Sequence, residues 1–290
     1  MTDRKKGIIA LVFLAGVYAS AGAVIRYLSF HFGLFQQIYL RTFLGLILGF
    51  LIFRKVNYGK LAKISPKEWL LLVGRTVSNN LAASLWVFAT PITKLANIAF
   101  IDSLPLTAAL SFLFAIERLT MRKAFWVLIS FLGVFILSVK NLSDITSFGV
   151  GEMFVYISGF FFAFRNISRR WHSKLLNDAE ISQIMNSMGM VFLFVVSMIA
   201  GESVGIPPMD PFLILMLLAG GFIMFANVFL TNYVFSVVPA VLGNNILNLE
   251  GVFAIMIGFV FYGEISTLRE LIGGAMIIVS VFQMNKAEKA

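Results

Sequence analysis

Residues 211–235, PFLILMLLAGGFIMFANVFLTNYVF, form an apolar run that decides the fold class. The run contains no charged side chain. An α-helix needs about 20 mainly apolar residues to cross a hydrocarbon core of roughly 30 Å. The run is long enough for that crossing, and it therefore predicts a transmembrane helix.

The composition of the whole chain agrees with this one run. Hydrophobic residues make up 59% of the 290 residues, charged residues make up 13%, and the mean hydropathy is +0.91. A soluble domain carries about 25% charged residues, so this chain has too little polar surface to cover a globule. Disorder is excluded as well, because it requires low hydrophobicity and high charge. We therefore expect an all-α polytopic membrane protein.

Further segments resemble residues 211–235 in length and hydropathy. The ten predicted transmembrane helices are 7–29, 34–54, 68–90, 94–116, 123–140, 148–168, 179–201, 211–235, 239–262 and 267–285. Their connectors are short and contain helix breakers such as Pro66 and Pro208. No connector is long enough to form a separate soluble domain.

The distribution of Lys and Arg predicts the orientation. With the N-terminus inside, the inner segments contain Arg4, Lys5, Lys6, Arg54, Lys55, Lys60, Lys63, Lys67, Arg118, Arg122, Lys123, Arg169, Arg170, Lys174, Lys286 and Lys289. The outer segments contain only Arg26, Lys94, Lys140 and Arg269. The positive-inside rule then places both termini in the cytoplasm, which requires an even number of crossings. We expect a multi-pass protein of a cell membrane, plasma or inner.

Several functional classes are excluded by what the sequence lacks. The chain has no cysteine, and its two histidines, His31 and His172, are far apart, so we expect no metal site. It has no Walker-type phosphate loop and no catalytic constellation, so we expect no cofactor and no enzymatic activity. The net charge of +9 lies in short clusters between apolar runs, which indicates cytoplasmic loops rather than a nucleic-acid partner.

The two halves of the chain repeat each other at an offset of 147 positions. The identical pairs include Gly74/Gly221, Asn80/Asn227, Asn97/Asn244, Phe112/Phe259, Glu117/Glu264, Thr120/Thr267 and Arg122/Arg269. Matched Asn, Glu and Arg are informative, because such residues are scarce in membrane spans. The repeat predicts two domains of five helices each, residues 1–141 and 148–285. Because five is odd, the second domain is inverted relative to the first, an arrangement typical of secondary transporters.

This organisation resembles the drug/metabolite transporter superfamily, and its EamA-like branch in particular. The residues that carry the resemblance are Tyr39 to Phe43, Pro105 to Glu117, Trp126 to Leu137, Gly251 to Glu264 and Leu271 to Phe282. One departure is that Pro105 aligns with Val252, so the two halves are not expected to bend equivalently. The resemblance implies a proton-linked or facilitative carrier of small metabolites, often an exporter.

Charged residues inside the predicted spans are the first candidates for a site, because each one is costly in lipid. Glu250 and Asp102 are candidates for proton or cation coupling. Arg41 and Arg75 are candidates for holding an anionic group of the substrate through forked hydrogen bonds. The alternative is that these acids and arginines pair with one another inside the bundle. Arg165 lies nearer the end of its span and is expected to snorkel toward water.

Amides and aromatic residues add a second group of candidates. Asn80, Asn227, Asn244 and Asn248 are expected to bind substrate, since an amide both donates and accepts. The alternative is that they join helices through hydrogen bonds. Tyr39 and Trp86 are candidates for the pocket wall, as are Tyr18 and Tyr233. Further residues are expected to be structural: the acids Glu117 and Glu264 at helix ends, and the glycines Gly45, Gly49, Gly220 and Gly221 at close helix contacts.

We therefore expect a secondary active or facilitative transporter, working as an exporter by alternating access around a midplane cavity. Its leading substrates are amino acids or related carboxylates, with protons as a possible coupling ion. One alternative is a proton-coupled exporter of cationic drugs or amines. Alternatives of other classes are an intramembrane lipid-modifying enzyme and a non-transporting receptor or scaffold. Its other partners would be membrane lipid and, if it is not a monomer, a second copy in a homodimer.

Overall fold

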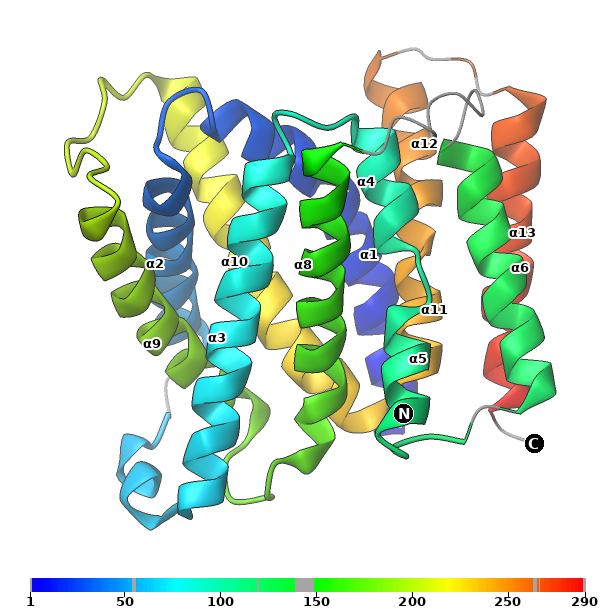
Figure 1. Ribbon diagram of the computed structural model, residues 1–290, viewed down its shortest axis with the longest axis horizontal. Helices are drawn as coiled ribbons and strands as arrows, with labels where there is room; N and C mark the ends of the chain where they lie inside the picture. The colour runs from blue at the N-terminus through cyan, green and yellow to red at the C-terminus, as the bar shows by residue number, and fades with distance from the viewer. Residues whose placement is uncertain are drawn as a thin grey trace.

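The computed structural model describes residues 2–53, 56–118, 120–138, 149–262, 265 and 267–288, and the regular secondary structure within them is helical (Figure 1). The first half contains α1 (Asp3–Leu28), α2 (Leu34–Ile52), η1 (Tyr58–Lys63), α3 (Pro66–Ala89), α4 (Leu95–Asp102), α5 (Leu106–Leu113) and α6 (Met121–Ser138). The second half contains α8 (Val150–Ile167), η2 (Ser168–Trp171), α9 (Asp178–Ile199), α10 (Pro211–Val237), α11 (Ala240–Leu247), α12 (Leu249–Tyr262) and α13 (Leu268–Ala287). The predicted domain limits at 141 and 148, and Glu264, lie outside the described residues.

The helices follow the predicted spans closely, and the all-α prediction is confirmed. Within the described residues, six segments are long and apolar enough to cross a membrane: α1, α2, α6, α9, α10 and the α11–α12 pair, taken as residues 240–260. The α4–α5 region contributes a shorter apolar stretch, Asn97–Leu113. Helices α3, α8 and α13 fall outside this set. Helices α3 and α8 bury polar side chains such as Arg75 and Arg165, which lower their hydropathy.

Helix starts are fixed by local chemistry in the sequence. The Ser65 side chain accepts a hydrogen bond from the backbone N–H of Glu68, and Pro66 occupies the first turn of α3. Asp210 caps α10 in the same way, with Pro211 as its first residue. Such caps satisfy donors that the helix itself leaves unpaired. They therefore set where each span begins.

Two of the predicted spans are interrupted. The span predicted at 94–116 consists of α4 and α5, separated by Ser103, Leu104 and Pro105. Pro105 has no N–H to donate to Ile101, and the Ile101 oxygen accepts from Leu104 N instead. The span predicted at 239–262 is also interrupted, at Asn248 between α11 and α12. This interruption needs no proline, because Val252 occupies the position that aligns with Pro105. Both spans are interrupted, and the proline-containing interruption is the longer one.

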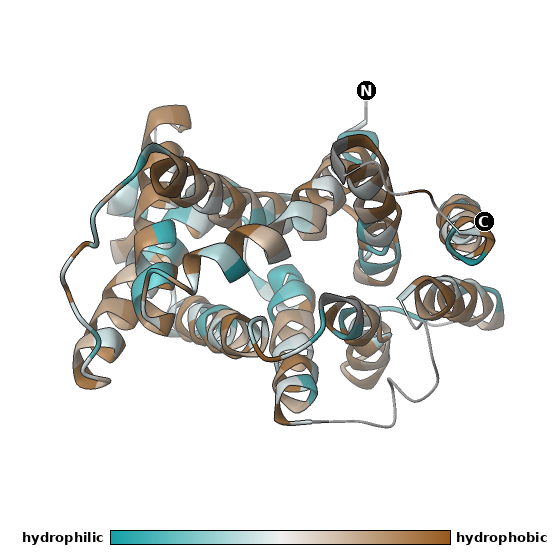
Figure 2. Ribbon diagram, turned by 90° about the horizontal axis from the view of Figure 1, so that it is seen from above, coloured by the Kyte–Doolittle hydropathy of each residue, from teal (hydrophilic) through white to brown (hydrophobic). Residues whose placement is uncertain are grey.

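The helices pack in pairs that link the two halves. Helix α2 packs on α9, α6 on α13, α3 on α8 and α1 on α10. Figure 1 labels these helices, and Figure 2 shows the bundle from above, coloured by hydropathy. Glycines permit the closest contacts: a Cβ on Gly133 of α6 would lie 2.8 Å from the Gly273 oxygen of α13. A Cβ on Gly45 of α2 would lie 3.1 Å from Phe225 N of α10, as expected for a close-packing glycine. Small residues at helix contacts are typical of bundles in lipid.

Both chain ends lie at one end of the bundle, which we call the terminal face. Figure 1 shows the start of α1, the end of α13 and the loops containing η1 and η2 there. The side chain of Arg4 donates to Asn285 Oδ1 at 3.0 Å, which ties the first helix to the last. An even number of crossings is consistent with this placement.

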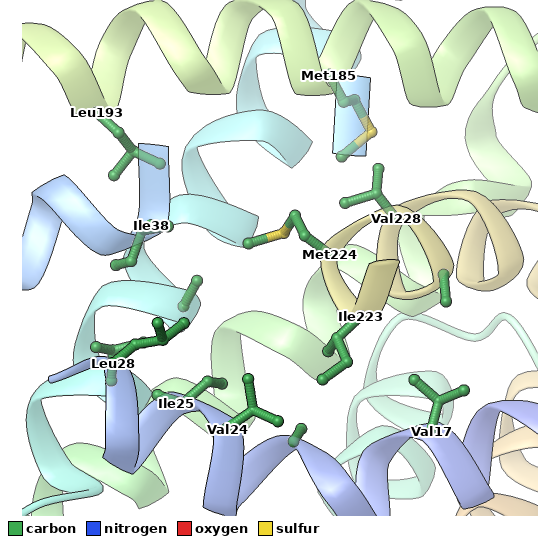
Figure 3. Packing of buried hydrophobic residues seen from close by; sticks show 14 of the residues in the cluster. Val17, Val24, Ile25, Leu28, Ile38, Met185, Leu193, Ile223, Met224 and Val228 are labelled. Atoms are coloured by element: carbon green, nitrogen blue, oxygen red, sulfur yellow. The ribbon is translucent and has the colours of Figure 1, made fainter. Parts of the chain in front are cut away.

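Apolar side chains from α1, α2, α3, α9 and α10 form the main core. Figure 3 shows part of this cluster, including Val24 and Leu28 of α1, Ile38 of α2, and Met185 of α9 near Val228 of α10. Large apolar side chains also cover the outside of the bundle, for example Leu70, Leu113, Ile199 and Phe282. An apolar outer surface of this extent suits a lipid environment and not water.

Candidate functional site

A cavity of about 180 Å³ lies between the two halves. Both broken helices line it. Asp102 and Ser103 come from the α4–α5 break, and Asn248 and Glu250 come from the α11–α12 break. Interrupted helices leave backbone and polar side chains free to meet a ligand, and at membrane depth they are tolerated where they line a cavity.

Two arginines form a cationic part of the wall. Arg41 of α2 is 2% exposed, and its Nε donates to the Gln37 backbone oxygen at 3.2 Å. Arg165 of α8 is 3% exposed, and its Nη1 donates to Asn79 Oδ1 at 2.6 Å and to Asn227 Oδ1 at 3.1 Å. Both line the cavity. These buried guanidinium groups are held by neutral oxygen acceptors.

Two carboxyl groups form an anionic part of the same wall. Asp102 is the last residue of α4, and its Oδ2 accepts a hydrogen bond from Trp86 Nε1 at 2.9 Å. Glu250 is in the first turn of α12. Among the ion pairs of the described residues, none joins either acid to Arg41 or Arg165. The alternative that these charges neutralise each other directly within the bundle is therefore not supported.

A tyrosine and an amide orient the Arg165 side chain. Tyr18 of α1 donates its hydroxyl to Asn227 Oδ1 at 2.6 Å, and the same oxygen accepts from Arg165. Asn166 accepts from Arg165 Nε and Nη2 at 3.2 and 3.0 Å. The Arg165 guanidinium also lies 4.9 Å from the Phe162 ring centroid, a cation–π contact. This arrangement holds Arg165 at the cavity.

The other amides at the cavity are tied to hydroxyl groups. Asn244 Oδ1 accepts from Thr107 at 3.1 Å, and Asn248 Nδ2 donates to Ser130 Oγ at 2.9 Å. Each of these bonds crosses from one half of the chain to the other. The amides therefore join helices, while each side chain still faces the cavity.

The structure brings most of the predicted site residues to one place. Of the predicted residues, the cavity wall contains Tyr18, Arg41, Trp86, Asp102, Asn227, Asn244, Asn248 and Glu250. Arg75, Asn80, Tyr39 and Tyr233 lie outside this wall. Asn80 is buried against Gly189, and the Tyr39 ring packs edge-on against Phe194, with ring centroids 5.4 Å apart.

Arg75 and Arg165 correct the sequence-based expectation. Arg75 does not reach the cavity, because its Nε and Nη2 bond to the Arg165 backbone oxygen and to Asn232. Arg165 does not snorkel, because its helix face turns inward and its guanidinium finds amide partners there. The neighbouring Asn166 was a signal for this, since an Arg-Asn pair within an apolar span indicates a polar face directed inward.

Glu117 has the structural role that the sequence predicts. Its carboxylate accepts from the backbone N–H groups of Ala240 and Val241, at the start of α11. A carboxylate is favourable at a helix N-terminus. No group of three or more metal-ligating side chains occurs in the described part of the chain.

The fold and this cavity define a multi-pass membrane protein with a polar chamber between two sets of helices. Residues 149–286 match the EamA-like transporter family, so the second half of the chain is an EamA-like transporter domain. This confirms the resemblance seen in the sequence. It also agrees with the expectation that the protein is not an enzyme, and it implies small-molecule transport across a membrane.

Comparison with solved structures supports the fold over the whole chain. A structure titled only "Crystal structure of protein" superposes with a TM-score of 0.78 and 12% sequence identity, and the match covers 98% of both chains. At that identity the likeness shows the fold alone. No curated protein matches the sequence.

Proposed function

We propose that this protein is a secondary transporter, working as an exporter, for small zwitterionic metabolites such as amino acids or related carboxylates. The observation that carries the proposal is the cavity wall, which has Arg41 and Arg165 as cations and Asp102 and Glu250 as acids without direct ion pairs between them. A buried charge without a counter-charge is costly. A zwitterion supplies a carboxylate to the arginines and an ammonium to the acids.

The size of the cavity favours a small substrate over a drug. Pockets for drug-sized ligands occupy about 300–1,000 Å³. The cavity here is about 180 Å³. A proton-coupled exporter of cationic amines remains the second candidate, supported by Asp102 and Glu250. Two arginines in the same wall would repel a simple cation, which makes this the weaker proposal.

The proposed mechanism is alternating access between two inverted repeats. It is supported by helix contacts that keep their pattern when the halves are exchanged. The offset of 147 aligns α1 with α8, α2 with α9, α3 with α10 and α6 with α13. Exchanging the halves therefore turns the α3–α8 contact into the α10–α1 contact and leaves the α2–α9 and α6–α13 contacts unchanged. The Ser280 hydroxyl bonds Trp126 O, and Gly133 lies against Gly273. The offset of 147 converts each of these contacts into the other.

The proposed orientation places the terminal face in the cytoplasm of a cell with the protein in its plasma or inner membrane. The loops containing η1 and η2 lie at this face and hold Lys60, Lys63, Arg169 and Arg170. Basic loops face the cytoplasm. Glu250 and Asp102 are proposed to carry protons as access alternates, with Arg41 and Arg165 holding the substrate.

The test is binding and transport with purified protein in liposomes. Radiolabelled amino acids, nucleosides and amines would be compared, with and without a pH gradient. We expect amino-acid uptake that Arg41→Gln and Arg165→Gln each reduce at least about tenfold, since each removes a charge-assisted hydrogen bond. Arg26→Gln is the matched control, because Arg26 bonds the Thr90 and Thr93 backbone oxygens outside the cavity wall. Uptake of amines alone would favour the second candidate.

A further inference from the structure

Arg75 of α3 connects the cavity to the terminal face. It is 2% exposed, and its Nε donates to the Arg165 backbone oxygen at 3.2 Å. The side chain of that same Arg165 lies in the cavity wall. Through Nη2, Arg75 also donates to Asn232 Oδ1 of α10 at 2.8 Å. One side chain of the first half thus bonds two helices of the second half.

A polar layer continues from Arg75 toward the terminal face. The Asn232 backbone oxygen accepts from Arg169 Nε, which also donates to Asp178 Oδ1 of α9 at 3.0 Å. On the other side, Glu68 of α3 accepts from His172 Nδ1 at 2.6 Å and from the backbone N–H of Ser173 at 3.0 Å. We call these residues, with Arg75, the polar layer. It joins α3 to the segment that runs from α8 through η2 to α9.

An apolar cluster packs α1, α8, α10 and α11 together. It includes Leu11 of α1, Ile167 of α8, Phe235 of α10 and Leu242 of α11. These side chains are at most 2% exposed. None of these side chains and no residue of the polar layer lines the cavity. The lining of the cavity therefore does not extend to the terminal face.

The bonding of Arg75 is incomplete, although the side chain is buried. Its Nη1 atom has no hydrogen-bond partner among the described residues. Its guanidinium bonds to two neutral oxygens. A buried cation with neutral partners and one unpaired donor is stabilised less than a complete ion pair, and it gains hydration when the layer opens. The closed arrangement is thus held by bonds that can be exchanged for water.

We propose that Arg75 is the positioning residue that locks the cavity closed toward the terminal face, and that release of its bonds to Arg165 and Asn232 opens the cavity there. Arg75 bonds the backbone oxygen of Arg165, and the side chain of Arg165 faces the cavity. Movement of Arg165 on binding or release of substrate is thereby transmitted to the layer. This proposal extends the proposed function by naming the gate of the alternating-access cycle.

The test measures thiol accessibility and needs no substrate, so its failure is distinct from failure of the proposed substrate class. The chain contains no cysteine, so Ala163→Cys places a single thiol in the cavity wall. A tag fused after residue 290, and its release by protease, identifies the side of the membrane that carries the terminal face. A membrane-impermeant maleimide is then added on that side, and full labelling after denaturation gives the total.

With Arg75 in place, we expect slow labelling from the terminal face. Arg75→Gln should accelerate it about tenfold or more, because losing hydrogen bonds to a charged group shifts a two-state equilibrium by at least that factor. Arg75→Lys should give an intermediate rate, since lysine keeps the charge but not the fork. Arg26→Gln, at the opposite end, should leave the rate unchanged.

Two results would overturn the proposal. One is a labelling rate in Arg75→Gln equal to that of the parent. The other is equal acceleration by Arg26→Gln, which would indicate general loosening of the bundle. If Arg75→Gln does not give a monodisperse protein, Asn232→Leu removes the other partner of the Nη2 bond and must accelerate labelling on its own.

Discussion

Trp86 Nε1 donates to Asp102 Oδ2 at 2.9 Å, so that α3 holds the last residue of α4 at the cavity wall. An indole is a donor only, and it therefore fixes one carboxylate oxygen and leaves the other free. Asp102 stands at the α4–α5 break, where Pro105 has ended the helix. The tryptophan thus orients a charged group at a point where the backbone alone does not.

Replacing this donor should weaken binding of a substrate ammonium group. Trp86→Phe keeps the aromatic ring but removes the N–H, and we expect affinity for amino acids to fall about fivefold, as for loss of a hydrogen bond worth about 1 kcal/mol. Isothermal titration of the purified protein measures this. Trp69→Phe on the same helix is the control, because Trp69 is 37% exposed on the outside of the bundle. Equal affinities for both variants would refute the role of Trp86.

Replacing the Glu250 carboxyl group should abolish proton coupling but leave substrate exchange intact. Glu250→Gln removes a group that can bind and release a proton, and we expect a pH gradient to lose its effect on uptake. Exchange of labelled for unlabelled substrate should continue, since it needs no net proton movement. Asp3→Asn, at an exposed position in the first turn of α1, is the control. Unchanged proton dependence in Glu250→Gln would reject this assignment.

The contact between α6 and α13 should be sensitive to a single added carbon. Gly133→Ala places its Cβ 2.8 Å from the Gly273 oxygen, so the helices must separate. We expect a loss of about 1–3 kcal/mol in stability, typical of overpacking, and a lower Tm in detergent. Gly74→Ala on α3 is the matched control, since its Cβ meets no atom within 4 Å. That variant should keep or slightly raise the Tm, because alanine favours a helix.

Acidification should weaken the polar layer through His172. Burial, together with the nearby positive charge of Arg75, lowers the pKa of His172 to about 4, and the contact with Glu68 opposes this only in part. The unfolded chain binds this proton near pH 6.5, whereas the folded chain does not until about pH 4. Stability should therefore fall as the pH drops from about 6.5 to about 4.

Thermal unfolding at a series of pH values checks this prediction. His172→Gln removes the titrating group, so its Tm should fall less steeply over that window than the Tm of the parent. His31→Gln serves as the control, because His31 is an exposed residue next to α1. If parent and His172→Gln follow parallel curves, His172 does not contribute to the acid sensitivity.

Much of the site was within reach of sequence reasoning. A charge or amide inside an apolar run is conspicuous because the run around it is long and uniform, and this identified Arg41, Asp102, Asn227 and Glu250 as residues that need partners or water. The span limits followed from the same property, with caps such as Ser65 and Asp210 fixing the ends. The Asn248 break could not be read in this way, since no proline or glycine occupies that position.

The difference between Arg75 and Arg165 shows where that reasoning ends. Hydropathy and spacing place a residue in a span and at a depth, and by depth alone Arg75 was the better candidate for the cavity and Arg165 the worse one. Which of them faces the cavity depends on how α3 and α8 are rotated against each other, and that rotation results from packing among side chains far apart in the chain. The amino-acid sequence therefore predicted a bundle of helices in lipid with energetically costly charges inside it. The contacts between helices assigned Arg165 to the cavity and Arg75 to the layer that closes it.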